Sequence, residues 1–283
     1  MKKIFLLFLL VSLFAQAKSA DQVYVMPHSG SNIAEFGQVA LSATAAVVGI
    51  LPVVNGGTGG STTQVARNNL GLAPTLTVIT ATGSGTYFIP TITPLYIRVR
   101  MVGGGGGGAS GGASNVVGGD GADTTFGSLL TASHGSKGQP SNIGASGGAC
   151  TINLPAKGIG IVGASSSGGI ATQTTSTLAP IGTSGASSAL GGSGGGGAIG
   201  AFAGISASIS SGSGGGGGGG PTSASGNGGS GGGAGCFIDA IISSPSSSYS
   251  YSVGSGGAAG SGGTGGNGGA GGSGMIEVTE YYM

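Results

Sequence analysis

The sequence predicts an all-β fold in which a β-sheet or sandwich core is combined with packed polyglycine II helices and glycine-rich loops. Short segments that alternate apolar and polar residues, such as Tyr96–Val102, have the period of two that is typical of half-buried strands. Glycine supplies 70 of the 283 residues, far above its usual share of roughly 7%. Only 5% of residues are charged and 38% are hydrophobic, which argues against disorder driven by charge repulsion.

The N-terminal 17 residues have the composition of a secretory signal peptide. Lys2 and Lys3 precede an apolar run from Ile4 to Phe14, and Ala15-Gln16-Ala17 forms an A-x-A cleavage site. The apolar run is too short to span a bilayer. We therefore expect cleavage after Ala17 and a protein that is secreted, extracellular or at a cell surface.

The charge of the mature chain argues against nucleic acid as a partner. Without Lys2 and Lys3, the 8 lysines and arginines become 6, against 7 acids, which gives a formal charge of −1. Phosphate binding needs clustered positive charge, which these scattered residues do not supply. The chain after the signal peptide has no run of about 20 continuous apolar residues, so no membrane span is expected.

Composition divides the mature chain into a first region, residues 18–74, and a glycine-rich domain, residues 75–283. In the first region Asn55-Gly56-Gly57 requires positive φ angles and predicts a turn. Thr62 or Thr63 is expected to cap a short helix that runs through Leu70, and Gly71 to end it.

This part of the first region resembles a motif that recurs in bacteriophage tail fibres. The two stretches that recur there are Leu-Pro-x-x-Asn-Gly-Gly-Thr-Gly, here residues 51–59, and Ala-Arg-x-Asn-Leu-Gly-Leu, here residues 66–72. The resemblance implies a joint between a fibre shaft and its tip, often in a homotrimer. A capped turn in an unrelated surface protein is the alternative.

Several short strands are expected in the glycine-rich domain. Leu76–Ile79 begins an apolar run, a turn is expected at Gly83–Gly85, and Tyr87–Ile89 resumes the strand. Phe237–Ile242 is consistent with a buried strand, and alternate residues of Tyr249–Val253 share one face of another.

Two further strands are expected directly beside glycine tracts. In Tyr96–Val102 the apolar residues at odd positions share one face, and Tyr96, Arg98 and Arg100 lie on the other, the solvent face. Met275–Tyr282 alternates in the same way and is predicted as a terminal strand. If the two strands are neighbours, Glu277 offsets one of the arginines, a pairing worth roughly 0.2–1 kcal/mol when exposed.

The glycine tracts have a three-residue register. Period three is the repeat of the left-handed extended helix with three residues per turn, so the side chains lie on one edge and the other two edges are bare. Buried copies must exchange N–H and C=O bonds with neighbours, since an unpaired group costs roughly 1–3 kcal/mol. In residues 254–274 the side chains fall at Ser255, Ala258, Ser261, Thr264, Asn267, Ala270 and Ser273, with Ala259 as the exception.

Three other interpretations of the tracts compete with a stack of polyglycine helices. Flexible linkers would not need a three-residue register. Collagen requires Gly-x-y with abundant proline, and the chain has only 10 prolines. Glycine-rich loops on an ordinary β-sandwich remain open.

The two cysteines, Cys150 and Cys236, form one disulfide or remain two small buried hydrophobic residues, and the sequence leaves both open. A bridge would add roughly 4 kcal/mol by the chain-entropy estimate.

The sequence predicts no catalytic residues, no metal and no cofactor. Gly-x-Ser-x-Gly occurs at residues 108–112, but glycine-serine tracts produce this pattern by chance, and none of its copies opens a helix after a strand. His28 and His134 belong to no cluster with metal-ligand spacing, and Asp120 and Asp123 are too few carboxylates to define a calcium site.

From about Gly83 to its end, the chain resembles the glycine-rich domain found at the ends of many phage tail fibres. The resemblance lies in the order of segments: residues 96–102 leading into polyglycine, then residues 124–127, residues 249–254 and the closing Gly-Met-Ile-Glu-Val strand. It implies glycine helices with binding loops between them, and an attachment protein, on a virion if the chain is phage-derived. A secreted wall or coat protein without a specific ligand is the alternative.

Two segments between glycine tracts are candidates for binding a cell-surface receptor or glycan. One is the threonine-rich segment that contains Gln173, Thr174, Thr175 and Ser176. The other carries Tyr249 and Tyr251, whose rings offer a flat apolar face with a polar tip. Solvated polar loops without a ligand are the alternative for both.

Overall fold

The computed structural model describes residues 57–61, 63–90, 93–114, 116–140, 143–170, 179–190, 192–221 and 226–282. The chain divides into two compact units, Met1–Thr63 and Gln64–Met283. The predicted signal peptide, with its cleavage site at Ala17, lies outside the described residues, as does the start of the fibre-like motif. The architecture below is that of the second unit.

A single short helix, α2 (Thr63–Asn69), is found in the described residues. Gly71, with φ of 69°, follows it and supplies the left-handed conformation in which helices commonly end. The helix and its stop agree with the expectation from the sequence. In the residues that the structure describes, no helix has the length and apolar character needed to cross a membrane.

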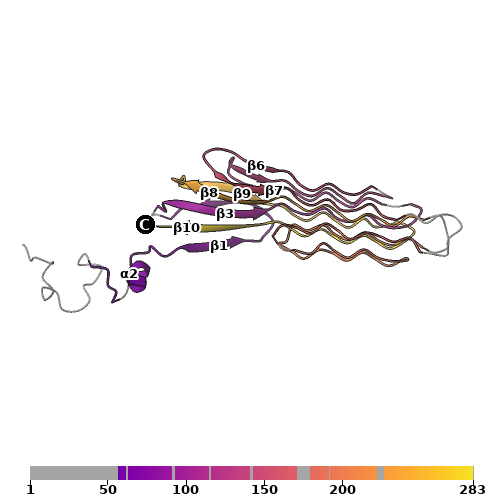
Figure 1. Ribbon diagram of the computed structural model, residues 1–283, viewed down its shortest axis with the longest axis horizontal. Coiled ribbons are helices and arrows are strands. Elements are labelled where there is room, and N and C mark those ends of the chain that lie inside the picture. Colours follow the sequence, from indigo (N-terminus) through magenta and orange to yellow (C-terminus); the bar gives the residue numbers. More distant parts are fainter. Residues whose placement is uncertain are drawn as a thin grey trace, which may run out of the picture. The chain divides into compact units, whose positions relative to one another are not determined.

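The first of two antiparallel sheets, sheet A, contains the two strands that the sequence predicted most clearly, at residues 96–102 and 275–281. Its strands in spatial order are β1 (Thr75–Ile79), β10 (Met275–Tyr281), β3 (Tyr96–Val102), β8 (Phe237–Ser243) and β7 (Lys157–Ile161) (Figure 1). The terminal strand β10 lies beside β3, and Glu277 is opposite Arg100, one of the two arginines expected to face it.

The second antiparallel sheet, sheet B, contains shorter strands. Their spatial order is β2 (Gly83–Phe88), β9 (Ser248–Val253), β4 (Thr124–Phe126), β5 (Leu130–Ala132) and β6 (Cys150–Ile152). The predicted turn at Gly83–Gly85 is wrong, because these residues pair with Val253, Ser252 and Tyr251 as the first half of β2. Glycine at position 85 leaves room for the ring of Tyr251, which occupies the place of a side chain there.

The hydrophobic core lies between the inner faces of the two sheets, so the all-β sandwich core expected from the sequence is confirmed. Sheet A contributes the odd-numbered residues of β3 and alternate residues of β8 and β10, as the period of two requires. Sheet B contributes an aromatic cluster in which Phe126 contacts Tyr87 and Tyr249 at ring-centroid distances of 5.9 and 4.8 Å.

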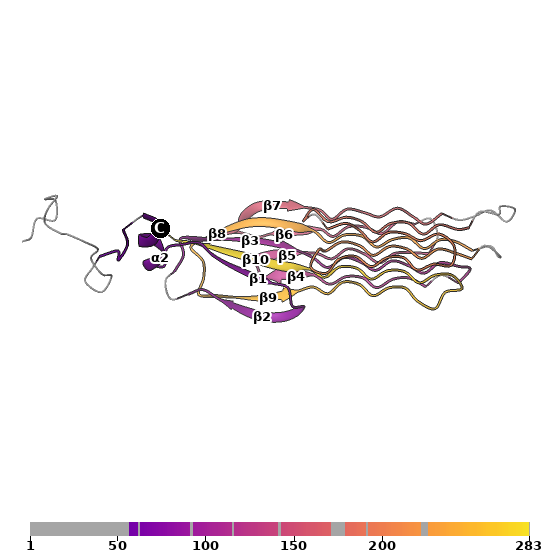
Figure 2. The ribbon, with the colours of Figure 1, turned by 90° about the horizontal axis from the view of Figure 1, so that it is seen from below.

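The glycine tracts continue from the ends of the strands. Figures 1 and 2 show them running side by side away from the two sheets as long extended segments that turn at the far end and return. Residues 103–112, the central tract, continue β3 and are buried throughout. Serine at position 110 is also completely buried, with its Oγ accepting a hydrogen bond from the Val116 N–H at 2.7 Å.

Hydrogen bonds of the central tract follow a period of three. The N–H groups of Gly105, Gly108 and Gly111 donate to residues 272, 269 and 266 of one neighbouring tract. The residues that follow each of them donate to a second neighbour, residues 226–236, and those that precede them donate to a third, residues 116–123. Carbonyl groups of the central tract accept from three further tracts, at residues 133–140, 212–221 and 254–261.

This pattern places neighbours all around the central tract, and glycine is what permits it. A Cβ added at Gly104, Gly106 or Gly107 would overlap a backbone carbonyl of an adjacent tract. Flexible linkers are therefore excluded for the described tracts, because their N–H groups are bonded to specific partners. The assignment to polyglycine II geometry stays a prediction, which the threefold hydrogen bonding supports.

A disulfide joins Cys150 and Cys236, whose Cα atoms are 5.6 Å apart. Cys150 begins β6 at the edge of sheet B, and Cys236 directly precedes β8 of sheet A. The bond therefore connects the two sheets at the point where the glycine tracts begin.

Candidate functional site

The threonine-rich segment that the sequence singled out, with Gln173, Thr174, Thr175 and Ser176, lies outside the described residues. Its flanks are described. Ile170 and Ile181 pair across the two tracts that lead to and from the segment, and Ile181 also pairs with Ile199. All three isoleucines are exposed, Ile199 to 63%.

Of the two candidate tyrosines of β9, whose side chains both belong to the core side of sheet B, Tyr249 needs correction. Tyr249 is only 7% exposed, its ring stacks on Phe126, and its hydroxyl accepts a hydrogen bond from the Ser246 N–H at 2.9 Å. Tyr251 is half-buried and packs against the core. The Tyr249 ring therefore presents no free apolar face to a receptor, whereas Tyr251 stays a prediction.

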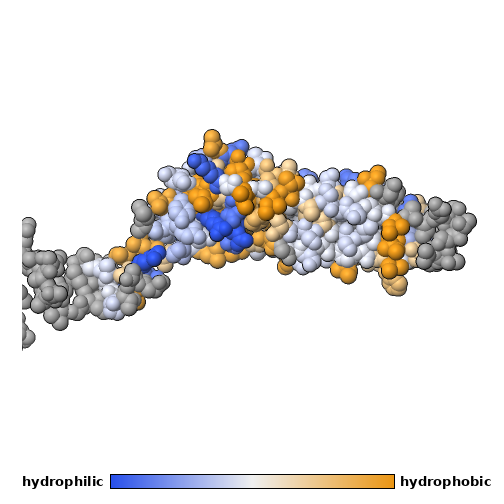
Figure 3. Space-filling model, in the orientation of Figure 1, coloured by the Kyte–Doolittle hydropathy of each residue, from blue (hydrophilic) through white to orange (hydrophobic). Residues whose placement is uncertain are grey.

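The outer face of sheet A carries the densest group of charged side chains in the described structure. Adjacent strands place Arg98 and Arg100 of β3 next to Asp239 of β8 and Glu277 of β10. Figure 3 shows this hydrophilic area with hydrophobic residues on either side of it. The exposed apolar residues of this sheet are Leu76 and Val78 on β1, Ile241 on β8, and Ile159 and Ile161 on β7.

Arg98 and Asp239 form a two-point ion pair. Arg98 Nε donates to Asp239 Oδ1 at 2.8 Å, and Nη2 donates to Oδ2 at 2.5 Å. The hydrogen bond and the positive charge of Arg98 lower the pKa of Asp239, and the charge of Arg100 adds to the effect. Arg100 also donates to Glu277 Oε1 at 3.3 Å. The carboxyl group of Asp239 is therefore ionised at neutral pH.

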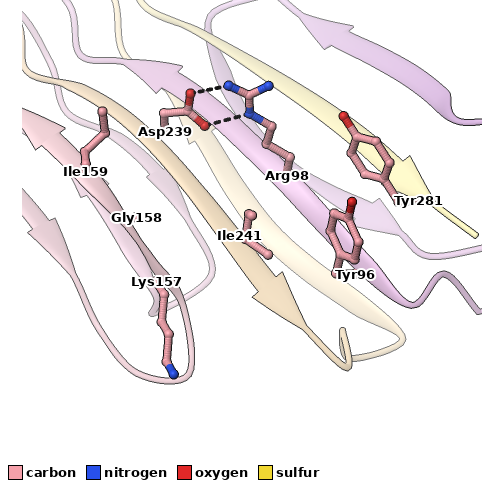
Figure 4. Close-up of a pocket in the computed structure, with 8 residues that line it drawn as sticks. All are labelled: Tyr96, Arg98, Lys157, Gly158, Ile159, Asp239, Ile241 and Tyr281. Atoms are coloured by element: carbon pink, nitrogen blue, oxygen red, sulfur yellow. Dashed lines mark hydrogen bonds and ion pairs between the residues drawn. The ribbon is translucent and has the colours of Figure 1, made fainter.

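A shallow hollow of about 360 Å³ lies beside this ion pair on sheet A (Figure 4). Ile241 is paired with Lys157 on β7 and with Arg98 on β3, and its side chain lies between those of Lys157 and Tyr96. The Tyr96 ring stacks on Tyr281 of β10 with centroids 4.7 Å apart and planes at 16°. The lining residues are Tyr96, Arg98, Lys157, Gly158, Ile159, Asp239, Ile241 and Tyr281.

A buried carboxyl group, Glu280, lies at the end of the core. Its side chain is only 2% exposed, and the hydroxyl groups of Tyr87 and Tyr282 donate to Oε1 at 2.5 Å and to Oε2 at 2.6 Å. Burial and the hydrogen bond to Glu280 raise the pKa of Tyr282 to about 12, and the same causes raise the pKa of Tyr87. Both tyrosines therefore remain protonated donors at neutral pH.

Two acidic residues of the glycine-rich body are also paired. Asp120 accepts from the Lys137 N–H at 2.8 Å and lies 3.4 Å from Lys137 Nζ, while Asp123 accepts from the His134 N–H at 2.9 Å. The backbone hydrogen bond from Lys137 lowers the pKa of Asp120. Within the described residues, no group of three or more His, Cys, Asp or Glu side chains is placed to hold a metal ion.

Sequence reasoning missed the hollow on sheet A and the cluster around Glu280. It did place Tyr96 and Arg98 on the solvent face of one strand, but β7 was not predicted, since Lys-Gly-Ile-Gly-Ile has only two apolar side chains. The signal that was available for the hollow is the presence of aromatic and charged residues at alternate positions of β3 and β10.

A comparison with protein-family models, curated proteins and solved structures found no match to this chain. The resemblance to tail-fibre tips is thus an interpretation of its residues alone.

Proposed function

We propose that this chain is an exported attachment protein, similar to a phage tail-fibre tip, that presents segments for binding a cell-surface receptor or glycan. The observation that carries the proposal is the threefold hydrogen bonding of the glycine tracts around residues 103–112. It fixes extended backbones side by side, and in this proposal the framework positions the binding segments that connect them. Binding residues are commonly found on loops positioned by a rigid scaffold.

Export is supported by two independent features. The N-terminal 17 residues have the composition of a signal peptide. The Cys150–Cys236 disulfide is a bond that forms and persists in oxidising compartments. We expect the mature protein in the medium or at the cell surface, or on virions if the gene is viral.

The proposal includes no catalysis. One copy of the Gly-x-Ser-x-Gly pattern, residues 108–112, lies within the central tract, where Ser110 is completely buried. A catalytic serine of that motif stands exposed on a sharp turn between a strand and a helix. This serine instead forms a hydrogen bond with a backbone N–H.

An adhesion assay tests the proposed function. The secreted protein is applied to intact cells and to a glycan array, beside a variant in which Gln173, Thr174, Thr175 and Ser176 are all glycine. We expect binding by the natural protein and its loss in the variant. A matched control replaces Ser244, Ser246 and Ser247, in the turn between β8 and β9, with glycine, and is expected to bind normally.

Three outcomes would contradict the proposal. Absence of binding to every surface and glycan would favour the alternative of a wall or coat protein without a ligand. Equal loss of binding in both variants, at unchanged thermal stability, would show that the threonine-rich segment has no special role. Conversion of a bound polysaccharide to shorter products would identify an enzyme. Light scattering of the same sample tests the homotrimer that the resemblance implies.

A further inference from the structure

The hollow on the outer face of sheet A combines an aromatic wall with an apolar floor. Tyr281 stacks on one face of the Tyr96 ring and so holds its orientation. Ile241, which is 44% exposed, forms the floor beside Tyr96. Ile159 of β7, which is 62% exposed, lines the hollow on the side away from Tyr96 (Figure 4). A saturated ring with C–H groups on one face fits such a surface, because aromatic and aliphatic side chains remove that face from water.

Hydrogen-bonding groups of both kinds lie at one end of the hollow. The side chain of Arg98 is 44% exposed, so the ion pair with Asp239 borders on solvent. The guanidinium group has five N–H donors, of which two are engaged by Asp239, and each carboxylate oxygen has the capacity to accept a further hydrogen bond. A ligand with vicinal hydroxyl groups, which both donate and accept, matches this pair.

The lining residues also carry one positive charge that is not offset. Arg98 is neutralised by Asp239, whereas Lys157 forms no ion pair with any described residue. Lys157 is exposed and lies next to Ile241 across the β7–β8 pair. An anionic group on the ligand would be attracted to this side of the hollow, opposite the tyrosines.

We propose that the hollow binds one acidic sugar unit of a polysaccharide, with its ring against Tyr96 and Ile241 and its carboxylate at Lys157. Arg98 and Asp239 bond the hydroxyl groups of the same unit. The volume of about 360 Å³ is at the small end of the range for ligand sites, roughly 300–1,000 Å³, and suits a single sugar ring. This inference rests on the proposed function in one respect, namely that the protein acts at a glycan-bearing surface; the site itself is separate from the threonine-rich segment.

Calorimetry with the intact secreted protein tests the site, using trigalacturonate as the acidic probe and maltotriose and inorganic phosphate as comparisons. We expect trigalacturonate to bind more tightly than maltotriose, and phosphate alone to give no measurable binding. Lys157→Gln should weaken trigalacturonate binding by about two- to fivefold, as expected for an exposed ion pair, and remove the preference over maltotriose. Tyr96→Ala should weaken both sugars by about tenfold.

Lys137→Gln is the matched control, because Lys137 is paired with Asp120 on the glycine-rich body and does not line the hollow. It should leave binding unchanged. The proposal is overturned if trigalacturonate does not bind, or if it binds the Lys157→Gln and Tyr96→Ala variants as tightly as the natural protein. It is also overturned if phosphate competes as well as the sugar acid. Cell adhesion separates the two proposals: adhesion without trigalacturonate binding removes only this site, and trigalacturonate binding without adhesion removes only the proposed function.

Discussion

At the scale of single residues, the glycine tracts contain positions that differ sharply in the space around them. Gly216 and Gly196 lie on adjacent tracts. A Cβ at Gly216 would overlap the carbonyl oxygen of Gly196, which is backbone and has no room to move. A Cβ at Gly196 would meet only the side-chain end of Ile205, at 3.3 Å.

We therefore expect Gly216→Ala to destabilise the protein and Gly196→Ala to be tolerated. Overpacking of this kind costs about 1–3 kcal/mol, which lowers the melting temperature of a chain of this size by roughly 2–4 °C for each kcal/mol. Gly196→Ala should change it by less than about 2 °C, because the smaller entropy of the unfolded chain offsets a mild contact. Thermal unfolding followed by circular dichroism measures both, and equal melting temperatures would contradict the close packing.

The Glu280 cluster predicts how stability changes at alkaline pH. A tyrosine in the unfolded chain has a pKa of about 10, while burial and Glu280 raise the pKa of Tyr282 to about 12 in the folded protein. The folded state therefore holds this proton more tightly. The stability that the protonated Tyr282 hydroxyl gives the folded protein is complete below pH ~10 and is lost as the pH rises to about 12. Tyr282→Phe should make the fall in melting temperature between these pH values shallower. Identical slopes for both proteins would show that Tyr282 does not contribute.

At the scale of elements, strands were predictable where alternation extends over enough residues to be recognised. Tyr96–Val102 and Met275–Tyr281 satisfy this condition, and their faces agree with the sequence, which left their pairing open. Thr124–Phe126 and Leu130–Ala132 have three residues each, too few for a period to be visible. Thr124–Phe126 becomes a strand because it pairs with β9, and Leu130–Ala132 because it pairs with Thr124–Phe126 and β6, which are tertiary effects.

The candidate site was less predictable than the fold, because tertiary contacts and not local sequence patterns bring its residues together. Arg98 and Asp239 are 141 residues apart, and only the order of strands brings them together. Tyr249 was misplaced because alternation shows which residues share a face but does not say which face is buried. The aromatic neighbours Phe126 and Tyr87, which decide this, come from other strands.

The disulfide acts at the scale of elements because it joins β6 of sheet B to the start of β8. Its two cysteines are 86 residues apart. Because the bond restricts the unfolded chain, it raises the free energy of unfolding by roughly 4 kcal/mol. Replacing both cysteines with alanine should lower the melting temperature by roughly 10 °C. Titration of the natural protein in denaturant should find no free thiol; two titratable thiols would show that the bond does not form.

At the scale of the whole molecule, no glycine tract can be stable alone. Ordering one residue of backbone costs roughly 1–2 kcal/mol, and a net hydrogen bond returns about 0.5–1.5 kcal/mol. The two magnitudes nearly cancel, so a tract is ordered only when both its N–H and C=O groups are bonded and neighbours exclude water. The central tract meets this condition, whereas tracts at the surface meet it on one side only.

Amide exchange should therefore be slowest at the centre of the glycine-rich body. Each N–H from Gly103 to Gly112 donates to another tract, so these amides can exchange only when several tracts separate together, and NMR should find them protected as a group. In residues 143–149 the described hydrogen bonds from backbone N–H groups are those of Ala145 and Gly148, and exchange there should be faster. Rapid exchange throughout residues 103–112 would mean that the glycine tracts are not bonded to one another, and the scaffold on which the proposed binding segments depend would not exist.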